Sequence, residues 1–565
     1  MKRLSVILLS FLLYLPLCAQ FKGTVYVDIN QSGTFDKGDK PLEGVMVTDG
    51  MNVVKTDRKG RFSLSGFEKT RFISITTPAG FETQQFYLPV KEDRKSYDFI
   101  VTESERTKGR EHSFIHITDT EVTGGVGRWV TDLQQYIKNE QPAFLIHTGD
   151  ICYEPGLTVH NQIVNAQTMD CPVYYCIGNH DLVKGNYGEE LYESIYGPTW
   201  YSFDVGNVHY VVTPIDHGDN PTDYTQRDVY NWLKNDLALM KKDQALVLFN
   251  HDLFTPGDNF VFKADKKDIL DFRTFNTKAQ IYGHMHYNYV RNQKGIYTIC
   301  TGTLDKGGID HSPSSFRDIK IDANDHLTTQ LRYTFIEPQI AIVSPMKNQA
   351  APIHPETGYQ LPVSVNTYNS QAKTSSVSYV LSNPEDNREI AKGNLSPLTD
   401  WNWSGNIQIP ANENGKKLNL TVTSSFNDGK EATATSQFLY QKDFKSTAIA
   451  GKDWNTLLQN ASHSGGINDS QIKLPLQLQW TANTGSNIFM TSPLIAGQRV
   501  FIATTNDNTS LNTYICAFDF HSGKQQVAKH AHMINEQSAK RSALKGQPVH
   551  SPGQHPGYQC KNAYA

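Results

Sequence analysis

Five short segments of the chain end an apolar run with side chains of the kinds that bind metal ions. A single run ending in aspartate is more often a turn or a helix cap, and one Gly-His-x-His segment alone is a weak signal. Five such ends in series, all offering oxygen or nitrogen atoms, are not expected from core packing. They are Asp119 with Glu121, Asp150, Asn179 with His180 and Asp181, His251, and His284 with His286. The series therefore predicts a centre for two metal ions.

These side chains need a layered domain of strands and helices to position them. Between residues 110 and 335, short apolar runs alternate with amphipathic stretches such as 129–139 and 227–240. Apolar residues recur at helical spacing in the second stretch. This alternation predicts an α/β domain. In such domains sites lie just beyond the carboxyl ends of the strands, which is where the candidate ligands fall.

The order and spacing of the five segments resemble the motif set of the calcineurin-like metallophosphoesterases. The motifs here read D-x-E at 119–121, G-D at 149–150, G-N-H-D at 178–181, an apolar run ending at His251, and G-H-M-H at 283–286. The likeness covers about residues 112–335. It implies a multidomain protein whose core is a four-layer α/β sandwich and whose activity is metal-dependent hydrolysis of phosphoric esters.

The resemblance also implies a role for each residue. Asp119 and His286 are expected to hold the first metal. Asn179, His251 and His284 are expected to hold the second, and Asp150 is expected to bridge the two. This ligand set suits Mn, Fe or Zn without choosing among them. Two cations about 4 Å apart can share a hydroxide as nucleophile and clamp the phosphate oxygens. His180 is expected near the leaving-group oxygen as a general acid or electrostatic stabiliser, with Asp181 orienting its imidazole.

The first motif departs from the family pattern. Its last position is usually histidine, and here it is Glu121. A carboxylate can still bind the first metal, but its charge should favour Mn, Mg or Fe. Tyr153 follows Gly-Asp at the spacing of the purple acid branch, where a tyrosine binds ferric iron. That branch lacks a ligand at the Glu121 position, so we interpret Tyr153 as a packing residue or a neighbour of the ligands. His116 and His147 lie inside strand-like runs and are expected in the core.

A glycine-rich loop follows the last ligand motif, at residues 301–317. Its polar groups could line the cleft, and Lys306, His311 and Arg317 are the candidate substrate contacts. An ordinary connection between strands explains the same composition equally well.

The first residues read as a secretory signal. A basic start is followed by an apolar run over 4–17 and small residues at its end, which predicts a signal peptide of residues 1–19. A lipoprotein anchor at Cys18 is the alternative, but bulky Leu17 disfavours it. No later segment is long and apolar enough to cross a membrane. We therefore expect an exported protein, in the periplasm or at the cell surface. The remaining cysteines show no disulfide framework.

Two β-rich segments flank the central domain, at residues 21–104 and 337–443. Each is expected to form an all-β sandwich module, and the layout resembles that of exported bacterial phosphoesterases with β-modules at both ends. The first segment contains alternating oxygen side chains and glycines that could wrap a calcium ion. The candidate ligands are Asp28, Asn30, Asp36 and Asp39. A tight polar turn between strands is the alternative interpretation.

The last part of the chain changes again. Residues 453–523 resemble the start of a quinoprotein-type β-propeller, and residues 524–565 form an irregular polar tail. We expect the chain to be truncated or frame-shifted after Lys524. The propeller segment also suggests a quinoprotein dehydrogenase, but so few blades cannot enclose a cofactor.

Charge narrows the function further. The 53 basic and 57 acidic residues give a net charge of −4, which argues against a generic binder of nucleic acid or anionic membranes. The leading hypothesis is an exported hydrolase of phosphate mono- or diesters, acting on a small-molecule, glycan or lipid substrate. The alternative is a cell-surface module that binds glycan or protein on a catalytically silent scaffold. The complete ligand set favours the enzyme.

Overall fold

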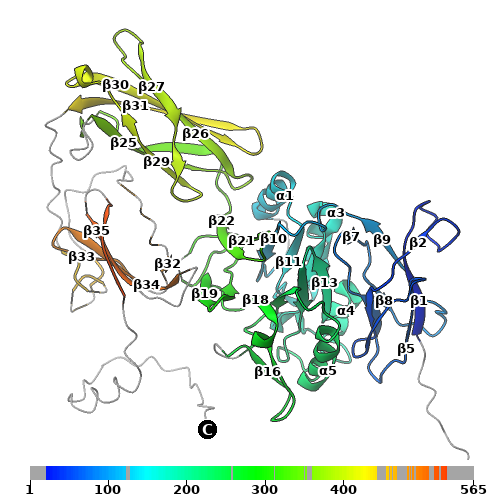
Figure 1. Ribbon diagram of the computed structural model, residues 1–565. Helices are drawn as coiled ribbons and strands as arrows, with labels where there is room; N and C mark the ends of the chain where they lie inside the picture. Colours follow the sequence, from blue (N-terminus) through cyan, green and yellow to red (C-terminus); the bar gives the residue numbers. More distant parts are fainter. Residues whose placement is uncertain are drawn as a thin grey trace, which may run out of the picture.

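A computed structural model describes residues 21–122, 127–255, 259–310, 312–348, 350–352 and 359–441, and parts of the segment between 453 and 530 (Figure 1). The predicted signal peptide, His311 and the tail beyond residue 530 lie outside the described residues. None of the described helices combines the length and apolar character needed to span a membrane.

The central domain, residues 110–335, is built on two sheets. The first has the strand order β12-β11-β10-β21-β22. Its strands are β10 (His112–Ile117), β11 (Phe144–His147), β12 (Val173–Tyr175), β21 (Ser315–Ile321) and β22 (Leu327–Tyr333). β10, β11 and β12 are parallel, whereas β21 and β22 join antiparallel. The three parallel strands therefore end at the same edge of the sheet.

The second sheet has the order β13-β14-β15-β18-β20-β19. Its strands are β13 (Tyr201–Val205), β14 (Val208–Val212), β15 (Ala245–Phe249), β18 (Asn276–Tyr282), β19 (Tyr289–Gln293) and β20 (Ile296–Cys300). β14, β15, β18 and β20 run parallel, and β13 and β19 close the edges as antiparallel strands. A two-stranded hairpin, β16 (Val261–Lys263) with β17 (Ile269–Asp271), follows β15.

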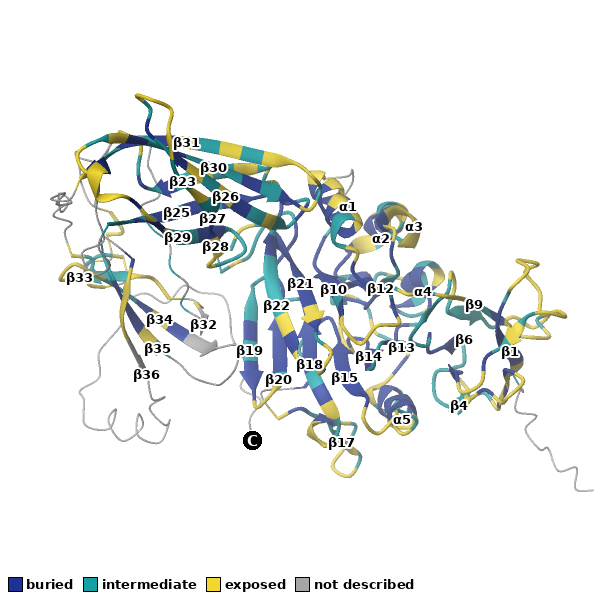
Figure 2. Cartoon of the chain, turned by 45° about the horizontal axis from the view of Figure 1, so that its top comes forward, coloured by how far each residue is buried: buried dark blue, intermediate teal, exposed yellow. Residues whose placement is uncertain are grey.

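One apolar core joins the two sheets. Phe114, Phe144, Phe203, Tyr210 and Phe249 meet there, and every residue of β11 and β15 is buried. Figure 2 shows β15 in dark blue, the colour of buried residues. The rings of Phe114 and Phe144 stack with their centroids 4.7 Å apart. Strands covered on both faces are expected to be apolar throughout, and these runs are apolar up to the point where the candidate ligands begin.

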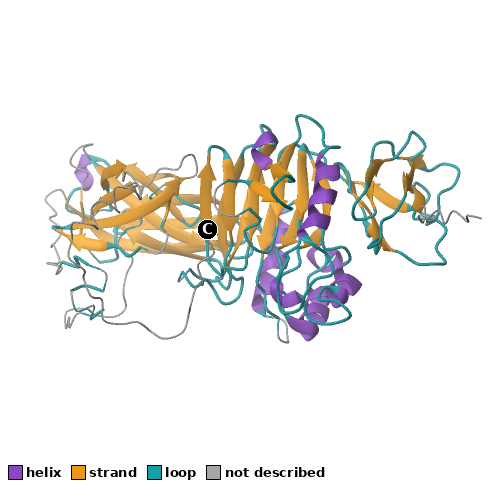
Figure 3. Ribbon diagram, turned by 90° about the horizontal axis from the view of Figure 1, so that it is seen from below, coloured by secondary structure: helices purple, strands orange, loops and turns teal. Residues whose placement is uncertain are grey.

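Helices cover the outer faces of both sheets, which gives the predicted helix–sheet–sheet–helix layers. Those beside the first sheet are α1 (Arg128–Glu140), α2 (Tyr153–Ile163), α3 (Ala166–Met169) and α4 (Glu190–Tyr196). α5 (Gln226–Leu237) buries Val229, Trp232 and Leu233 against the second sheet. Figure 3 shows most helices gathered in this central part, with strand-rich parts on either side of it. Short 3-10 turns η1 (Asn179–Asp181) and η2 (Phe272–Thr274) complete the domain.

The N-terminal module, residues 21–104, consists of strands in two sheets around one core. The first sheet holds β1 (Phe21–Val27), β2 (Lys40–Pro41), β5 (Arg61–Leu64), β7 (Phe81–Glu82) and β9 (Phe99–Glu103), and the second holds β3 (Met46–Thr48), β4 (Val53–Lys55), β6 (Phe72–Ile75) and β8 (Tyr87–Pro89). It is joined to β13 of the central domain, where Thr76 and Ser202 share a hydrogen bond of 2.8 Å and Phe86 packs 4.6 Å from the ring of Tyr201.

The C-terminal module, residues 337–443, also has two sheets with one core between them. One sheet holds β23 (Gln339–Ser344), β25 (Gln360–Tyr368), β28 (Ser396–Pro397) and β29 (Asn402–Gln408). The other holds β24 (Ala350–Pro352), β26 (Thr374–Ser382), β27 (Glu389–Asn394), β30 (Lys417–Phe426) and β31 (Glu431–Gln441). The 3-10 turn η3 (Ala411–Glu413) lies between β29 and β30 in the chain.

Arg332 of β22 joins this module to the central domain. Its buried guanidinium donates to the carbonyl oxygens of Asn369 and Ala372 at 2.6 and 3.2 Å. The side chain also lies over the rings of Tyr136 and Tyr368.

The described part of the last segment is one small sheet with the path β32-β34-β35-β36, and β33 pairs with β34. The strands are β32 (Ser486–Asn487), β33 (Leu494–Ala496), β34 (Arg499–Asp507), β35 (Tyr514–Asp519) and β36 (Gln525–His530). Trp480 donates from Nε1 to the carbonyl oxygen of Phe520 at 2.8 Å and stacks near Phe518. A propeller with further blades stays a hypothesis.

Candidate metal centre

The predicted ligands gather where the parallel strands of the two sheets end. Asp119 and Glu121 follow β10, Asp150 follows β11, and Asn179 follows β12 in the first sheet. From the second sheet, His251 follows β15, and the two histidines of the last motif follow β18. Segments up to 167 residues apart in sequence (119 to 286) thus deliver their side chains to one place.

The backbone at these positions takes an uncommon conformation. Asp119, Glu121, Asp150, His284 and His286 all have positive φ, between 42° and 62°. Non-glycine residues avoid this region, at a cost of roughly 1–3 kcal/mol each, and residues held there cluster at functional sites. The fold therefore holds the backbone of these five residues in a conformation that an ordinary turn would give to glycine.

Two glycines let the ligand segments approach one another. A Cβ on Gly178 would lie 2.1 Å from the backbone nitrogen of Asp150. A Cβ on Gly283 would lie 1.8 Å from Oγ1 of Thr118 and 2.5 Å from Oδ2 of Asp119. Both contacts are impossible for any other residue, so these glycines are required by packing.

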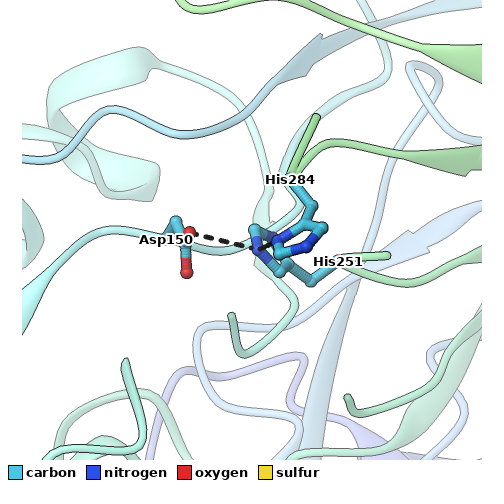
Figure 4. Close-up of side chains that lie close together, drawn as sticks. All are labelled: Asp150, His251 and His284. Carbon is cyan, nitrogen blue, oxygen red and sulfur yellow. Dashed lines mark hydrogen bonds and ion pairs between the residues drawn. The ribbon is translucent and has the colours of Figure 1, made fainter. Parts of the chain in front are cut away.

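Asp150, His251 and His284 lie together (Figure 4). With Asn179, which contacts His251, they form the first of two groups, which we call the inner half-site. Nε2 of His251 lies 3.2 Å from Oδ2 of Asp150, 3.2 Å from Nδ1 of His284 and 3.0 Å from Oδ1 of Asn179. His251 is fully buried. Four potential ligand atoms therefore converge around a site that is partly open to solvent at Asn179 and His284.

The hydrogen bonds of His251 indicate its tautomer and the charge that the inner half-site favours. Its Nδ1 lies 2.7 Å from the carbonyl oxygen of Thr148, which can only accept, so Nδ1 carries the proton. Nε2 then faces oxygen atoms of Asp150 and Asn179. Burial lowers the pKa of His251, but attraction from Asp150 outweighs it and raises the pKa to about 9. The cluster therefore favours a positive charge between these atoms, which a proton on Nε2 or a metal cation can supply.

Asp119, His286 and Glu121 form the second group, the outer half-site, with Asp150 shared between the groups. Nε2 of His286 lies 3.2 Å from Oδ1 of Asp119 and 3.6 Å from Oε1 of Glu121. Oδ2 of Asp119 accepts from the Thr118 hydroxyl and the backbone of His284, at 2.6 and 3.0 Å. Among the described residues, no hydrogen-bond donor satisfies buried Oδ1. An orphaned carboxylate oxygen beside an imidazole fits a metal ligand.

Lys306 contacts the unusual member of the outer half-site. Its Nζ lies 2.5 Å from Oε2 of Glu121. Burial lowers the pKa of Lys306, but the hydrogen bond to Glu121 raises it above its ordinary value. The Lys306 loop is tied to the ligand segment, since the backbone of Ile309 donates to the carbonyl oxygen of His286 at 2.7 Å. One cation of this chain therefore offsets the charge that Glu121 adds.

His180 is positioned by a residue that the sequence did not indicate. Its Nδ1 lies 2.9 Å from Oδ2 of Asp219, so the prediction that Asp181 orients this ring is wrong. Burial lowers the pKa of His180, but the hydrogen bond that its ring donates to Asp219 and the charge of Asp150 raise it above its ordinary value. Asp219 directly follows Gly218 but lies seven residues beyond the end of β14, so it lacks the strand-end signal of the other segments.

Asp181 instead supports the backbone of the ligand loops. It is fully buried and accepts from the backbone nitrogens of Asp150, Cys152 and Gly178, at 3.0, 2.9 and 2.8 Å. Burial, and then repulsion from Asp150, raises the pKa of Asp181 to about 6. Its role is to hold two loops at the spacing that the centre requires.

The remaining candidates divide between rim and core. Tyr153 is half exposed, with its ring 5.6 Å from that of His180. His116 and His147 are fully buried and bonded to threonines, as expected. Arg317 was expected as a substrate contact, but this is wrong. It lies 4% exposed on β21, and burial lowers its pKa to about 10.

The candidate calcium ligands lie together in an exposed loop but bind one another. Asn30 donates to Asp36 at 3.0 Å, and Asp39 accepts from the backbones of Ile29 and Asp36. Asp28 accepts from the backbones of residues 32 and 33. These contacts account for a polar turn, and nothing in the described loop supports calcium.

Comparisons with known proteins match two parts of the chain. Residues 112–288 match the family described as calcineurin-like phosphoesterase, and residues 29–104 match the family described as the N terminal of calcineurin-like phosphoesterase. The central part of the chain is therefore similar to calcineurin-like phosphoesterases, and the preceding part to the N-terminal domain described for them. No curated protein matches the sequence.

Solved structures with similar parts include three of different origin. The purple acid phosphatase PPD1 of yellow lupin seeds is 14% identical, with a TM-score of 0.30, over 52% of this chain and 67% of that one. GAP50, the anchor in the inner membrane complex of Plasmodium, is 14% identical, with a TM-score of 0.29, over 40% and 84%. A novel archaeal phosphodiesterase is 11% identical, with a TM-score of 0.22, over 39% and 99%.

Proposed function

We propose that this protein is an exported, binuclear metal-dependent hydrolase of phosphate mono- or diesters. The observation that carries the proposal is the pair of ligand groups, Asp150 with His251 and His284, and Asp119 with His286, which share Asp150. The family of the central domain supports hydrolysis of phosphoric esters in general. Binuclearity, export and the mechanism are our inferences.

The residues present fit two divalent metal ions. We assign Asp119, Glu121 and His286 to the outer ion, Asn179, His251 and His284 to the inner ion, and Asp150 to both. When bound, the metals supply activation of water and neutralisation of the phosphate charge. Their identity among Mn, Fe and Zn stays open, because the donor set suits all three.

His180 supplies the proton that the leaving group needs. As water adds to phosphorus, the bond from phosphorus to the ester oxygen breaks, and that oxygen takes a proton. Asp219 holds Nδ1 of His180, so Nε2 is the nitrogen available to donate. The backbone nitrogen of His180 donates to Oδ1 of Asp150 at 3.0 Å, which ties the acid to the ligand shared by both groups.

The flanking segments complete the proposal. We assign residues 1–19 to a signal peptide, 21–104 and 337–443 to β-sandwich modules, 453–523 to a partial propeller-like repeat and 524–565 to a tail. Exposure of the N-terminal and C-terminal modules on either side of the central domain is compatible with a cell-surface or periplasmic protein. A binding protein with a silent scaffold is the alternative that the assay must exclude.

The test is turnover of bis-p-nitrophenyl phosphate and p-nitrophenyl phosphate with added Mn²⁺, together with metal analysis. We expect two metal ions per chain, activity that a chelator abolishes, and loss of activity in Asn179→Ala. The matched control is Asn394→Ala, on an exposed position of β27, which should behave as wild type. Full metal occupancy without turnover of either ester would instead support the silent scaffold.

A further inference from the structure

A cavity of about 470 Å³ lies beside the metal centre. It is enclosed by the loop after β14, by the segment after β15, by β16 and by the start of α5, and we call it the α5 cavity. Its volume lies within the range of small-molecule pockets, roughly 300–1,000 Å³. None of the functions assigned above uses it.

The walls of the α5 cavity adjoin the segments that carry the ligands and His180. Asn250 and Asp252 both line it, and they flank His251 in the chain. The opposite wall contains Asp216 and His217, and the same loop continues to Asp219, which holds His180. This places the cavity on the side of the centre where the leaving group departs.

The loop that forms this wall is packed directly on a ligand segment. The backbone nitrogen of Asp219 donates to the carbonyl oxygen of Asn179 at 3.1 Å. A Cβ on Gly218 would lie 2.4 Å from the same carbonyl oxygen, so no side chain fits between the loop and Asn179. The geometry of the cavity wall is therefore fixed relative to the inner half-site and to His180.

The cavity has an apolar floor and a polar rim. Phe254 and Phe262 stack in the floor with their centroids 4.6 Å apart, and Val229 of α5 is buried beside them. The rim offers donors and acceptors, with Gln226 and Lys263 exposed. Asp216 is held in place by the side chain of Gln226 and by Nδ1 of His217, which lies 2.9 Å away.

We propose that the α5 cavity is the leaving-group subsite and that it takes a neutral sugar ring bearing the scissile phosphate. Sugar hydroxyls donate and accept, which suits a rim of carboxylates, an amide and an ammonium group. Their C–H faces suit the apolar floor. The lining contains two carboxylates, Asp216 and Asp252, and one lysine, Lys263, and this excess of negative charge disfavours a leaving group that carries further phosphates.

This inference rests on the proposed phosphoesterase function, and the first experiment separates the two. Steady-state kinetics with Mn²⁺ compare glucose 1-phosphate, adenosine 5′-monophosphate and p-nitrophenyl phosphate. We expect kcat/KM to favour one of the two sugar phosphates over the aryl ester, and the preferred one identifies a free sugar or a nucleoside as the source of the ring.

Variants of the rim test the cavity itself. Gln226→Ala and Lys263→Ala should each lower the ratio of kcat/KM for the preferred sugar phosphate to that for the aryl ester by roughly two- to tenfold, the loss of about one hydrogen bond. Lys267→Ala is the control, because it lies in the same hairpin connection but does not line the cavity. An unchanged ratio in both rim variants, with normal turnover of the aryl ester, overturns the inference and leaves the phosphoesterase intact.

A second readout does not depend on turnover. Saturation-transfer NMR with D-glucose and with adenosine measures binding of the dephosphorylated ring alone. We expect a signal for one of them in the wild type, weakened in Gln226→Ala and retained in Lys267→Ala. Absence of a signal for both probes would contradict the assignment, whereas binding without hydrolysis of any ester would preserve the cavity and refute the phosphoesterase.

Discussion

The two half-sites of the centre differ in how closely they follow the family pattern. Each combines a fully buried ligand with a partly buried one, His251 with His284 in the inner half-site and Asp119 with His286 in the outer one. The inner half-site keeps the usual ligand types, and the outer one carries Glu121 paired with Lys306. The half-sites therefore differ mainly in the Glu121–Lys306 pair, which lies in the outer one.

The largest effect is expected where the two halves meet. Asp150→Ala removes the shared ligand and leaves His251 and His284 facing each other without a carboxylate, so both metals and all activity should be lost. Metal analysis and turnover of bis-p-nitrophenyl phosphate check this. Asp243→Ala, at an exposed position, is the control. Retention of one tightly bound metal would show that the half-sites are independent.

A smaller effect is expected on the inner side, at the residue that positions His180. Asp219→Asn should lower kcat for an alkyl phosphoester by roughly 10- to 100-fold, because the ring loses its charged partner. Turnover of p-nitrophenyl esters should change much less, since p-nitrophenolate leaves without a proton. KM should stay constant. Equal losses for both substrate types would point to a structural defect.

The outer half-site should determine the metal preference. Glu121→His restores the usual ligand and removes a negative charge, so preference should move from Mn²⁺ toward Zn²⁺ by a factor on the order of ten. Competition binding with the two ions, followed by metal analysis, measures the shift. If preference does not change, Glu121 binds Lys306 rather than the metal.

The smallest effect concerns Lys306. Lys306→Met removes the cation that offsets Glu121, and affinity for the outer metal should rise by up to about fivefold, the value of a solvent-exposed charge pair. Calorimetric titration with Mn²⁺ measures this rise, with Lys242→Met as control. A fall in affinity would mean that Lys306 holds Glu121 in its binding position.

Much of the centre was predictable because each ligand follows a buried strand. The stretches 129–139 and 227–240 correspond to α1 and α5, and the strand ends place the ligands together. The sequence did not reveal which side chains from different loops form hydrogen bonds with each other. Asp219 lies 39 residues from His180, and its loop's path depends on packing against Asn179.

The opposite error arose at Arg317. A charged residue in a loop-like, glycine-rich stretch suggested a surface contact, but β21 begins at Ser315 and carries this arginine into the interior. Burial of a guanidinium is rare enough that sequence patterns disfavour it. Arg332 is a second buried arginine, and its guanidinium donates to a carbonyl oxygen of the C-terminal module.

Arg332 has a consequence for how this protein can change over evolutionary time. Its guanidinium belongs to the central domain, whereas Asp400 and the carbonyl oxygens that satisfy it belong to the C-terminal module. Replacing that module with an unrelated one would leave a buried charge without partners, which costs several kcal/mol. Recombination between genes is therefore expected to transfer the central domain and the C-terminal module together, as one inherited unit.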